Sequence, residues 1–381
     1  MQPGLVLQLG TTLTIPLEFQ IGSHEEVVTI TNTTPLIDVA STRVGGNVGT
    51  AELTELPAMN RSYLATVALL PGIQFMPSNQ LGNDTIVASG QASQNNNISV
   101  DGGYNVDDNS GTNFGPQVRT PLEAIQESQV VTSMYGAEHG RAGAAVVNVV
   151  TRQGTNSFRG VVFAHAAGDH LTARDYFAKE RNLPEPEVAK REWGFVVGGP
   201  IVRNKAHFFF SLERQVDKPS RTGVFNTRPS LNFSIAEDRT SWNSLIRFDH
   251  QINANHTWAV RWLREDAPQH PIVGGRSTQE TFSDETDRDQ MILGTLTSVF
   301  GNSRVNAFRV ARTWEHWWQG NECFRAQGGN DDWTGFEFGK ENAGNQALCL
   351  PQLNHRSFQV QDGIEAQGLW DSNYQVEDHH C

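Results

Sequence analysis

A run of acidic and amide side chains between Asp101 and Asn109 is the first place where this sequence could bind a metal ion. Calcium-binding loops carry oxygen ligands at alternate positions, with a glycine at the sixth position and a glutamate at the twelfth. Counted from Asn105, the glycine comes one place late, at Gly111, and no glutamate closes the loop. We therefore expect no metal site here, and no cofactor is indicated elsewhere in the sequence.

The cysteines and histidines do not form a zinc-binding or catalytic pattern. Cys323, Cys349 and Cys381 lack the Cys-x-x-Cys spacing that structural zinc sites use. Cys323 and Cys349 fall in one polar, glycine-rich segment, where a disulfide and two independent thiols are both compatible with the spacing. No Ser-His-Asp or Cys-His order stands in a context that would activate a nucleophile. We expect no catalytic residues and a protein that is not an enzyme.

Charge and hydropathy exclude further classes of protein. Acidic residues outnumber basic ones by 42 to 29, and the formal charge is −13. Because clusters of Lys and Arg that could neutralise phosphates are absent from the sequence, nucleic acid is not an expected partner. The apolar stretches also fall far short of the roughly 20 residues that a membrane-spanning helix needs. A mean hydropathy of −0.43, with 35 Gly and 20 Phe, is typical of strands that are apolar on one face only.

After Gly154 the sequence falls into alternating segments of about ten residues, which short turns and long polar loops separate in turn. This pattern predicts the strands of an outer-membrane β-barrel. The expected strands are 158–167, 193–202, 206–215, 242–252, 256–265, 290–300 and 304–314. The short turns fall at 203–205, 253–255 and 301–303. The two-residue period is clear where Ile246 and Phe248 alternate with Arg247 and Asp249.

A soluble β-sandwich can show the same alternation, so the choice between the two depends on other features. The strands are long, and short turns alternate with long loops such as 266–288 and 321–360. Aromatic residues near the strand ends suit the two girdles that flank a membrane's apolar layer. These residues are Trp242, Phe300, Trp314, Trp317 and Trp318. A membrane barrel is the better interpretation.

The segment before the barrel pattern has a mixed α and β character. Apolar residues with helical spacing predict a helix over Ser62–Leu70, ended by Pro71-Gly72. Short strands are expected at 86–88, 98–100, 128–132 and 145–151. Gly136, Gly140 and Gly143 are interpreted as turn residues, because no phosphate-binding glycine motif is present. Together these elements predict a compact domain of about a hundred residues.

The sequence from Pro121 to Gly160 closely resembles the end of the plug domain of TonB-dependent receptors and its passage into the first barrel strand. Glu55–Ile73, Asn95–Gly103 and the hairpin Lys190–Glu213 also resemble this family. The stretch around Gly4–Ile21 is similar to the end of a carboxypeptidase-regulatory-like domain, an order typical of Oar-like receptors. The resemblance covers most of the chain. It implies a mainly β fold with a small α+β plug and the N-terminal part of a large antiparallel transmembrane β-barrel.

This resemblance assigns four segments to the chain. Residues 1–23 would be the tail of the regulatory-like β-sandwich, 24–40 a TonB-box-like segment and linker, 41–154 the plug, and 155–381 the first barrel strands. Such barrels have about 22 strands, so the barrel is incomplete here. The lack of a signal peptide agrees with an internal fragment.

Three groups of site residues follow from the resemblance. The TonB-box candidate is Glu25, Glu26, Val27, Val28, Thr29, Ile30 and Thr31, a β-prone run able to add to the edge of another sheet. The ligand-facing plug loop candidate is Asp101, Tyr104, Asn105, Asp107, Asp108 and Asn109. The candidates for plug-to-barrel contacts are Glu123, Glu127, Glu138 and Arg141, although solvated surface charge explains these four equally well.

The implied function is uptake of a ligand across the outer membrane of a Gram-negative bacterium, with energy from the TonB complex of the inner membrane. The expected partners are TonB, outer-membrane lipid and a ligand that is a small molecule, an oligosaccharide or a peptide. The alternative is a surface binding or adhesion protein without active transport. A secreted carbohydrate-active β-protein is a third reading.

Overall fold

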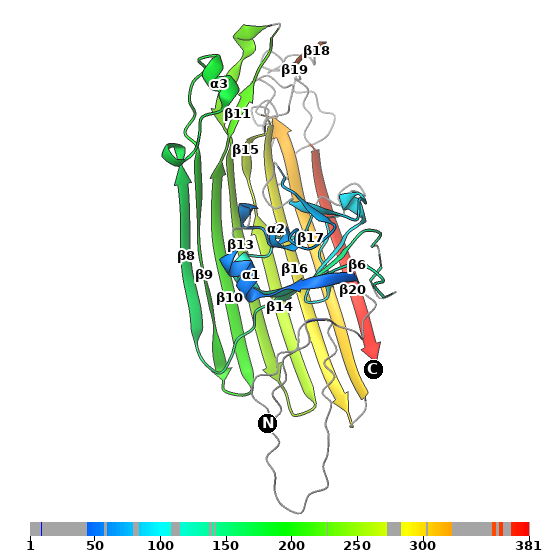
Figure 1. Ribbon diagram of the computed structural model, residues 1–381. Helices are drawn as coiled ribbons and strands as arrows, with labels where there is room; N and C mark the ends of the chain where they lie inside the picture. Colours follow the sequence, from blue (N-terminus) through cyan, green and yellow to red (C-terminus); the bar gives the residue numbers. More distant parts are fainter. Residues whose placement is uncertain are drawn as a thin grey trace, which may run out of the picture.

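The computed structural model describes a tall, curved sheet with a small domain against its concave side (Figure 1). The residues described are 9, 44–56, 59–78, 84–107, 115–136, 139–140, 142–226, 228–272, 283–301, 304–321, 353–355, 358–360 and 367–380. The predicted TonB-box segment, most of the predicted regulatory-like tail and the three cysteines lie outside them. We call the tall sheet the wall sheet and residues 44–151 the inner domain.

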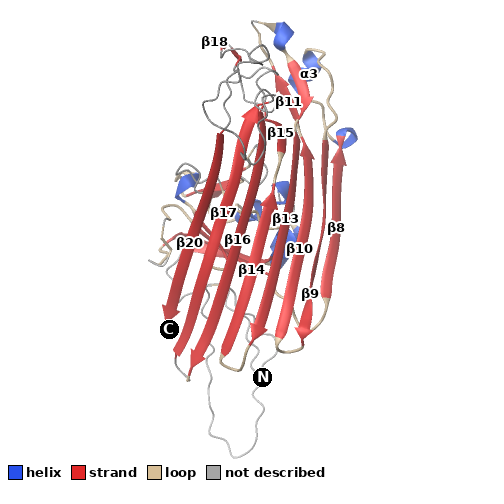
Figure 2. Ribbon diagram, turned by 180° about the vertical axis from the view of Figure 1, so that it is seen from behind, coloured by secondary structure: helices blue, strands red, loops and turns tan. Residues whose placement is uncertain are grey.

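The wall sheet is antiparallel, and its long strands follow one another in chain order, as the view from behind shows (Figure 2). They are β8 (Arg159–Gly168), β9 (Ala189–Val202), β10 (Ala206–Lys218), β13 (Asp238–Gln251), β14 (His256–Asp266), β16 (Ser283–Phe300), β17 (Arg304–Asn321) and β20 (Gln367–His380). The short β15 (Gln269–Ile272) pairs with both β13 and β16. In this chain the sheet is open, with β8 and β20 at its two edges.

The seven predicted strands and their short turns are confirmed, but the upper ends of two strands are longer than expected. β16 begins at Ser283, inside the predicted loop 266–288, and β17 runs past its predicted end at 314 to Asn321, where the next predicted loop begins. β20 was missed altogether. Its outward positions include Ser372 beside Tyr374 and Val376, so its apolar alternation is weak. Pairing with β17 along its whole length defines it as a strand.

The outward face of the wall sheet carries an apolar band between aromatic residues. Ile246, Val260, Ile292, Leu296 and Val310 are each more than a third exposed there. Trp193 and Trp242 meet edge to face at 5.3 Å toward the long-loop end, and Phe248 and Trp258 lie 5.1 Å apart toward the short turns. This arrangement is the expected outer surface of a barrel in lipid. Trp317 does not belong to it, because strand alternation places it on the inward face, opposite Asp287.

The long-loop end carries small additional elements. They are η5 (Asp169–Leu171), α3 (Tyr176–Glu180), β11 (Ser220–Gly223), η6 (Pro229–Leu231), β12 (Phe233–Ala236), β18 (Leu353–His355) and β19 (Phe358–Val360). Phe225 and Phe233 form a small separate core under the β11–β12 hairpin. Asp175 caps α3 by accepting a hydrogen bond from the Ala178 amide at 2.8 Å. Long structured loops at one end and tight turns at the other give the sheet its polarity.

The inner domain is built on a five-stranded sheet in the order β1-β6-β7-β4-β5, in which only the β4–β7 pair is parallel. Its strands are β1 (Val44–Val48), β4 (Asn97–Val100), β5 (Gly103–Tyr104), β6 (Ile125–Ser133) and β7 (Val146–Thr151), with β2 (Ile73–Met76) and β3 (Thr85–Ala88) as a separate hairpin. The helices are α1 (Thr50–Glu55), η1 (Met59–Arg61), α2 (Tyr63–Val67), η2 (Ser93–Asn95) and η4 (Leu122–Ala124). The predicted helix over Ser62–Leu70 is confirmed as α2, and each predicted short strand is present.

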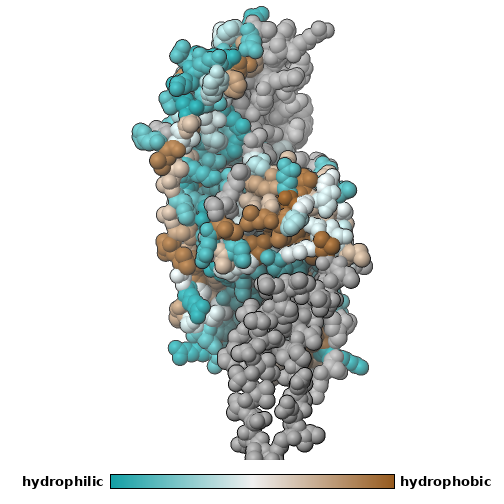
Figure 3. All heavy atoms as spheres, viewed as in Figure 1, coloured by the Kyte–Doolittle hydropathy of each residue, from teal (hydrophilic) through white to brown (hydrophobic). Residues whose placement is uncertain are grey.

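Among the described residues, no helix is long and apolar enough to cross a membrane. The main hydrophobic core belongs to the inner domain and continues into the wall sheet, where Leu245, Leu263 and Met291 join it. Hydrophobic residues also gather on the outer side of the inner domain and along the β8 edge (Figure 3). Leu69 and Met134 of the inner domain and Val162 of β8 are among the exposed apolar side chains of the described residues.

We predict that a charge on the outward band destabilises the full-length barrel according to its depth. Val260→Arg places a cation in the middle of the band and should cost about 2–4 kcal/mol, because lipid does not solvate it. Ile252→Arg, on the same face next to a short turn, should cost about 0–1 kcal/mol. Urea unfolding of the protein in liposomes measures both values. Equal costs for the two variants would contradict a membrane-facing band.

Candidate functional site between the inner domain and the wall sheet

The inward face of the wall sheet is organised in rows, because neighbouring strands pair in continuous register. One row joins Glu213, Asn243, Glu265, Asp289 and Glu315, each directly opposite the next on adjacent strands. All five side chains are buried. We call the four carboxylates of this set the acidic row. It lies about one residue from the level of the Trp193–Trp242 pair, so it is near the long-loop end of the apolar band.

Below the acidic row, the inward face is apolar and packs against the inner domain. Leu245, Leu263 and Met291 are directly opposite one another and at most 1% exposed. The backbone of β5 approaches this row so closely that a Cβ on Gly103 would lie 2.1 Å from the Met291 Cε. A side chain at Gly103 would therefore displace the end of the Met291 side chain at the contact between the two parts. This apolar layer joins the hydrophobic core of the inner domain to the wall.

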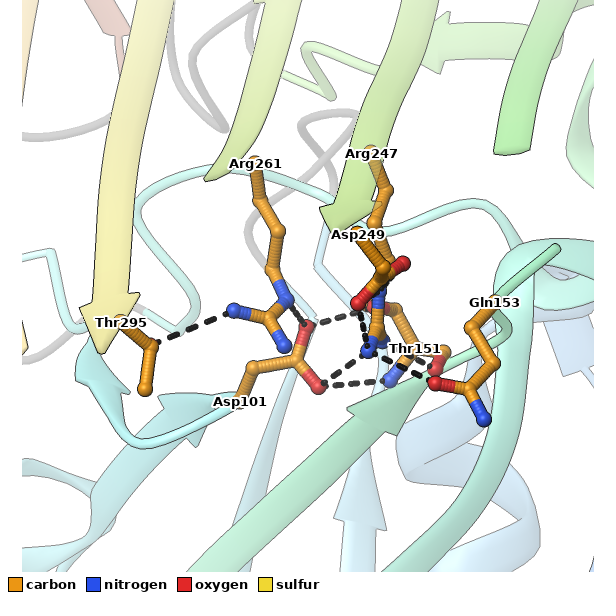
Figure 4. A network of polar contacts seen from close by, with 7 residues as sticks. All are labelled: Asp101, Thr151, Gln153, Arg247, Asp249, Arg261 and Thr295. Atoms are coloured by element: carbon orange, nitrogen blue, oxygen red, sulfur yellow. Dashed lines mark hydrogen bonds and ion pairs between the residues drawn. The ribbon is translucent and has the colours of Figure 1, made fainter. Parts of the chain in front are cut away.

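The next level down carries a pair of like charges. Arg247 of β13 and Arg261 of β14 are directly opposite each other, and their side chains are less than a tenth exposed. Two guanidinium groups in this position repel each other unless an anion lies between them. Asp101 of the inner domain supplies that anion (Figure 4). Its carboxylate lies 2.6 Å from Arg261 Nε and 3.8 Å from Arg247 Nη1.

Asp101 is held in place by its own domain. It begins the tight turn between β4 and β5 with a φ of +51°, a left-handed conformation that Asp tolerates better than most residues. The Thr151 amide and hydroxyl donate to its two carboxylate oxygens at 3.0 and 2.5 Å. Arg247 in turn donates to the Thr151 carbonyl at 2.8 Å and pairs with Asp249. The result is a closed polar network across three strands (Figure 4).

The acidic row is met by the inner-domain segment 115–120. The Arg119 amide donates to Glu265 Oε2 at 2.8 Å, and its guanidinium donates to Gln215 and lies 4.0 Å from Glu213. Burial disfavours the charged form of Arg119, but the charges of Glu213, Glu265 and Glu192 outweigh burial and raise its pKa. Arg119 therefore stays cationic. Gln117 Nε2 donates to Asp289 Oδ1 at 2.9 Å.

A second ion pair joins the inner domain to β9. Arg61 pairs with Glu123 of its own domain and with Glu192 of the wall sheet. Burial disfavours its charge, yet the hydrogen bonds and charges of the two carboxylates raise its pKa. Lys190 Nζ adds a hydrogen bond to Asn60 Oδ1 at 3.1 Å.

The far side of the inner domain is tied to the last strands of the wall sheet. Gln375 of β20 accepts from the Tyr104 amide at 2.7 Å and donates to the Gly102 carbonyl at 3.2 Å. Thr313 of β17 donates to the Tyr104 carbonyl at 3.3 Å. Toward the short turns, a cavity of about 340 Å³ opens beside Arg247 and Arg261. The inner domain is thus fixed by separate polar contacts at several heights of the wall.

The predicted contact residues take different places. Among the described residues, Glu123 is linked to the wall through Arg61, whereas Glu127 lies on β6 as part of the inner-domain sheet and accepts from the Leu9 amide at 3.4 Å. Glu138 and Arg141 lie outside the described residues.

The predicted ligand loop is also divided. Asp101 is 4% exposed and faces the wall, and Asn105 is fully buried, where it bonds both backbone groups of Val118. Tyr104 contacts β17 and β20, and Asp107 is buried. Asp108 and Asn109 lie outside the described residues.

The residues that dominate the interface were not singled out from the sequence. Arg119 stands in a loop without a motif, and Arg247, Arg261, Glu213 and Glu265 look like the polar half of an alternating strand. The available signal was their position on the inward face, since the predicted alternation already placed Arg247 and Asp249 opposite the apolar side. The residues that they contact could be identified only from the strand register of the structure.

A tall antiparallel sheet with an apolar outer band and a polar inner face, closed by short turns at one end, defines a membrane β-barrel wall. The chain matches the model of the family described as "outer membrane beta barrel domain" over residues 150–234 and 226–380. The chain therefore belongs to this family, and its location is the outer membrane of a Gram-negative bacterium. The predicted fold class and location are confirmed.

The chain is 29% identical over 234 residues to the TonB-dependent transporter Oar of Myxococcus xanthus, which covers 58% of this chain and 21% of that protein. It thus spans about a fifth of that relative's length. Among solved structures, the outer membrane transporter YddB of Escherichia coli matches with a TM-score of 0.60 at 9% identity, over 73% of this chain and 40% of that one. The siderophore receptor PirA of Acinetobacter baumannii matches with 0.57 at 16% identity, over 72% and 40%. These likenesses show the fold.

We predict that Asp101→Asn loosens the inner domain. Removing one partner of a buried ion pair costs about 3–5 kcal/mol, because Arg261 loses its counterion and Arg247 keeps only Asp249. Faster hydrogen exchange at residues 97–104 and 146–151 of the full-length protein would report the change. Adding Arg261→Gln should restore part of the protection. Glu180→Gln, in an exposed pair with Arg181, is the control, and unchanged exchange in Asp101→Asn would contradict the role of this network.

We predict a pH-dependent stability from Asp84, which accepts from the Ser78 amide at 3.0 Å and contacts Asn60. Burial raises its pKa despite these hydrogen bonds and the charge of Arg119. A carboxyl with a raised pKa in the folded state stabilises most below its unfolded pKa and loses that contribution as pH rises through the folded one. Protection of residues 59–78 should fall over this window in the wild type and less in Asp84→Asn. The same slope in both proteins would rule Asp84 out as the cause.

Proposed function

We propose that the longer protein containing this chain is a TonB-dependent transporter, in which the inner domain is the plug of the barrel. The named relative and two of the structural neighbours are transporters or receptors, which supports a non-enzymatic role. Segments 1–23, 24–40, 41–154 and 155–381 would be the regulatory-like tail, the TonB-box segment with its linker, the plug and the first barrel strands. The ligand would be a small molecule, an oligosaccharide or a peptide.

The observation that carries this proposal is how the inner domain is fixed to the wall. Most of the hydrophobic core lies within the inner domain, and discrete ion pairs at Asp101, Arg119 and Arg61 hold the domain against the sheet. A domain held in this way can be shifted by breaking a few contacts while the strand pairing of the wall stays intact. A domain that only filled the barrel lumen would not need contacts that can be broken one by one.

The energy for such a shift must come from outside, because the outer membrane has neither ATP nor an ion gradient of its own. Glu25–Thr31 would be the handle: an extended segment added to the sheet edge of TonB. Its backbone hydrogen bonds are worth about 0.5–1.5 kcal/mol each, and when loaded together they resist a pull along the strand. Force on this segment would reach the plug through the linker that follows it.

We predict that the handle touches TonB in cells. A photo-crosslinking residue at Val28 of the full-length protein should give an adduct with TonB, whereas the same residue at Asn253, in a short periplasmic turn, should not. Thr29→Pro combined with the label at Val28 should reduce the adduct strongly, because proline removes a donor from the added strand. Thr29→Ala is the matched variant and should retain it. A normal barrel without any TonB adduct would favour a surface binding or adhesion protein that does not transport.

A further inference from the structure

We propose a calcium site on the inward face of the wall sheet, formed by Asp287, Asp289 and Glu315 where the acidic row meets the inner domain. Each of these residues offers a carboxylate oxygen, and the three oxygens lie within 4.8 Å of one another. Asp289 and Glu315 are directly opposite on β16 and β17, and Asp287 is two positions along β16 on the same face. The proposal does not depend on transport.

The carboxylates of Asp287 and Asp289 are close together and partly or fully withdrawn from water. Asp289 is 3% exposed, and Asp287 is half-buried. Within the described ranges neither has an ion pair with Lys or Arg, since Arg119 lies with Glu213 and Glu265 further along the row. Like charges this close either bind a cation or share protons.

A second, independent observation points to a ligand. Glu265 is directly opposite Asp289 on the neighbouring strand and is only 3% exposed. One of its oxygens accepts from the Arg119 amide, but the other, Oε1, has no hydrogen-bond donor within the described residues. The same holds for Asp287 Oδ1. Buried oxygens without donors carry a desolvation cost, which coordination to a cation would offset.

The donor set favours calcium over other cations. Carboxylate oxygens suit hard ions, and no cysteine or histidine belongs to the set of three, which argues against zinc and copper. Calcium accepts six to eight oxygens in irregular geometry, whereas magnesium demands a near-ideal octahedron. Carboxylates from two strands of a pleated sheet provide an irregular coordination geometry. Gln117 of the inner domain donates to Asp289 at 2.9 Å, so the ion would lie next to the plug contact.

The test uses terbium as a luminescent substitute for calcium in the full-length protein, purified in detergent and freed of metal. Trp317 lies directly opposite Asp287, so excitation of tryptophan should sensitise terbium emission, and added calcium should displace it. Asp289→Asn should weaken calcium binding roughly tenfold or more, because one ligand charge is lost. Trp317→Phe should lower the terbium emission, whereas the calcium affinity measured by calorimetry should stay unchanged.

Glu377→Gln is the control, because Glu377 faces inward on β20 and pairs with Arg309 and His379 instead. It should bind calcium like the wild type. Asp287→Asn, at a half-buried position, gives a second variant if Asp289→Asn fails to fold, as judged by heat-modifiable migration on gels. No saturable calcium binding by the wild type, or equal affinity in the folded Asp variants, would overturn the proposal and leave shared protons as the explanation.

Discussion

The constraint on which the rest of the structure depends is that a barrel wall in lipid must carry its charges on the inward face. The outward band excludes them, and the inward face then collects like charges in rows because the strands pair in register. The direct result is two rows of like charge: Arg247 opposite Arg261, and the carboxylates from Glu213 to Glu315. Such rows are stable only when something of opposite charge lies against them. The inner domain meets this need with Asp101 and Arg119.

The two kinds of contact between the parts have different roles. Apolar packing around Leu245, Leu263 and Met291 contributes area and little directional preference. The polar contacts are directional, because Asp101 pairs with the two arginines and Arg119 with the carboxylates. Since each polar contact joins one residue of the inner domain to one or two of the wall, each can be broken singly. A holding surface that is specific yet separable is what the proposed plug role would require.

The inner domain does not supply a cation to every carboxylate on this part of the wall. Arg119 lies beside Glu213 and Glu265. Asp289 receives an amide donor from Gln117, and neither Asp289 nor Asp287 has an ion pair with Lys or Arg within the described residues. The imbalance lies at the level of the Trp193–Trp242 pair, near the end of the apolar band. A bound cation at this place would complete the charge balance that the inner domain begins.

The sequence by itself determined the class of fold, because periodicity is local: strands, short turns and the inward side of Arg247 and Asp249 follow from alternation every two residues. It also indicated the helix near Tyr63 and the separate domain ahead of the barrel. The tertiary structure decided which charges meet. Asp101 lies 146 positions from Arg247 and 160 from Arg261 in the chain, and no local pattern encodes such pairings. The strand register brings the carboxylates of the acidic row side by side. Pairing with β17 revealed β20, since a weakly alternating strand is defined by its neighbour and not by its own residues.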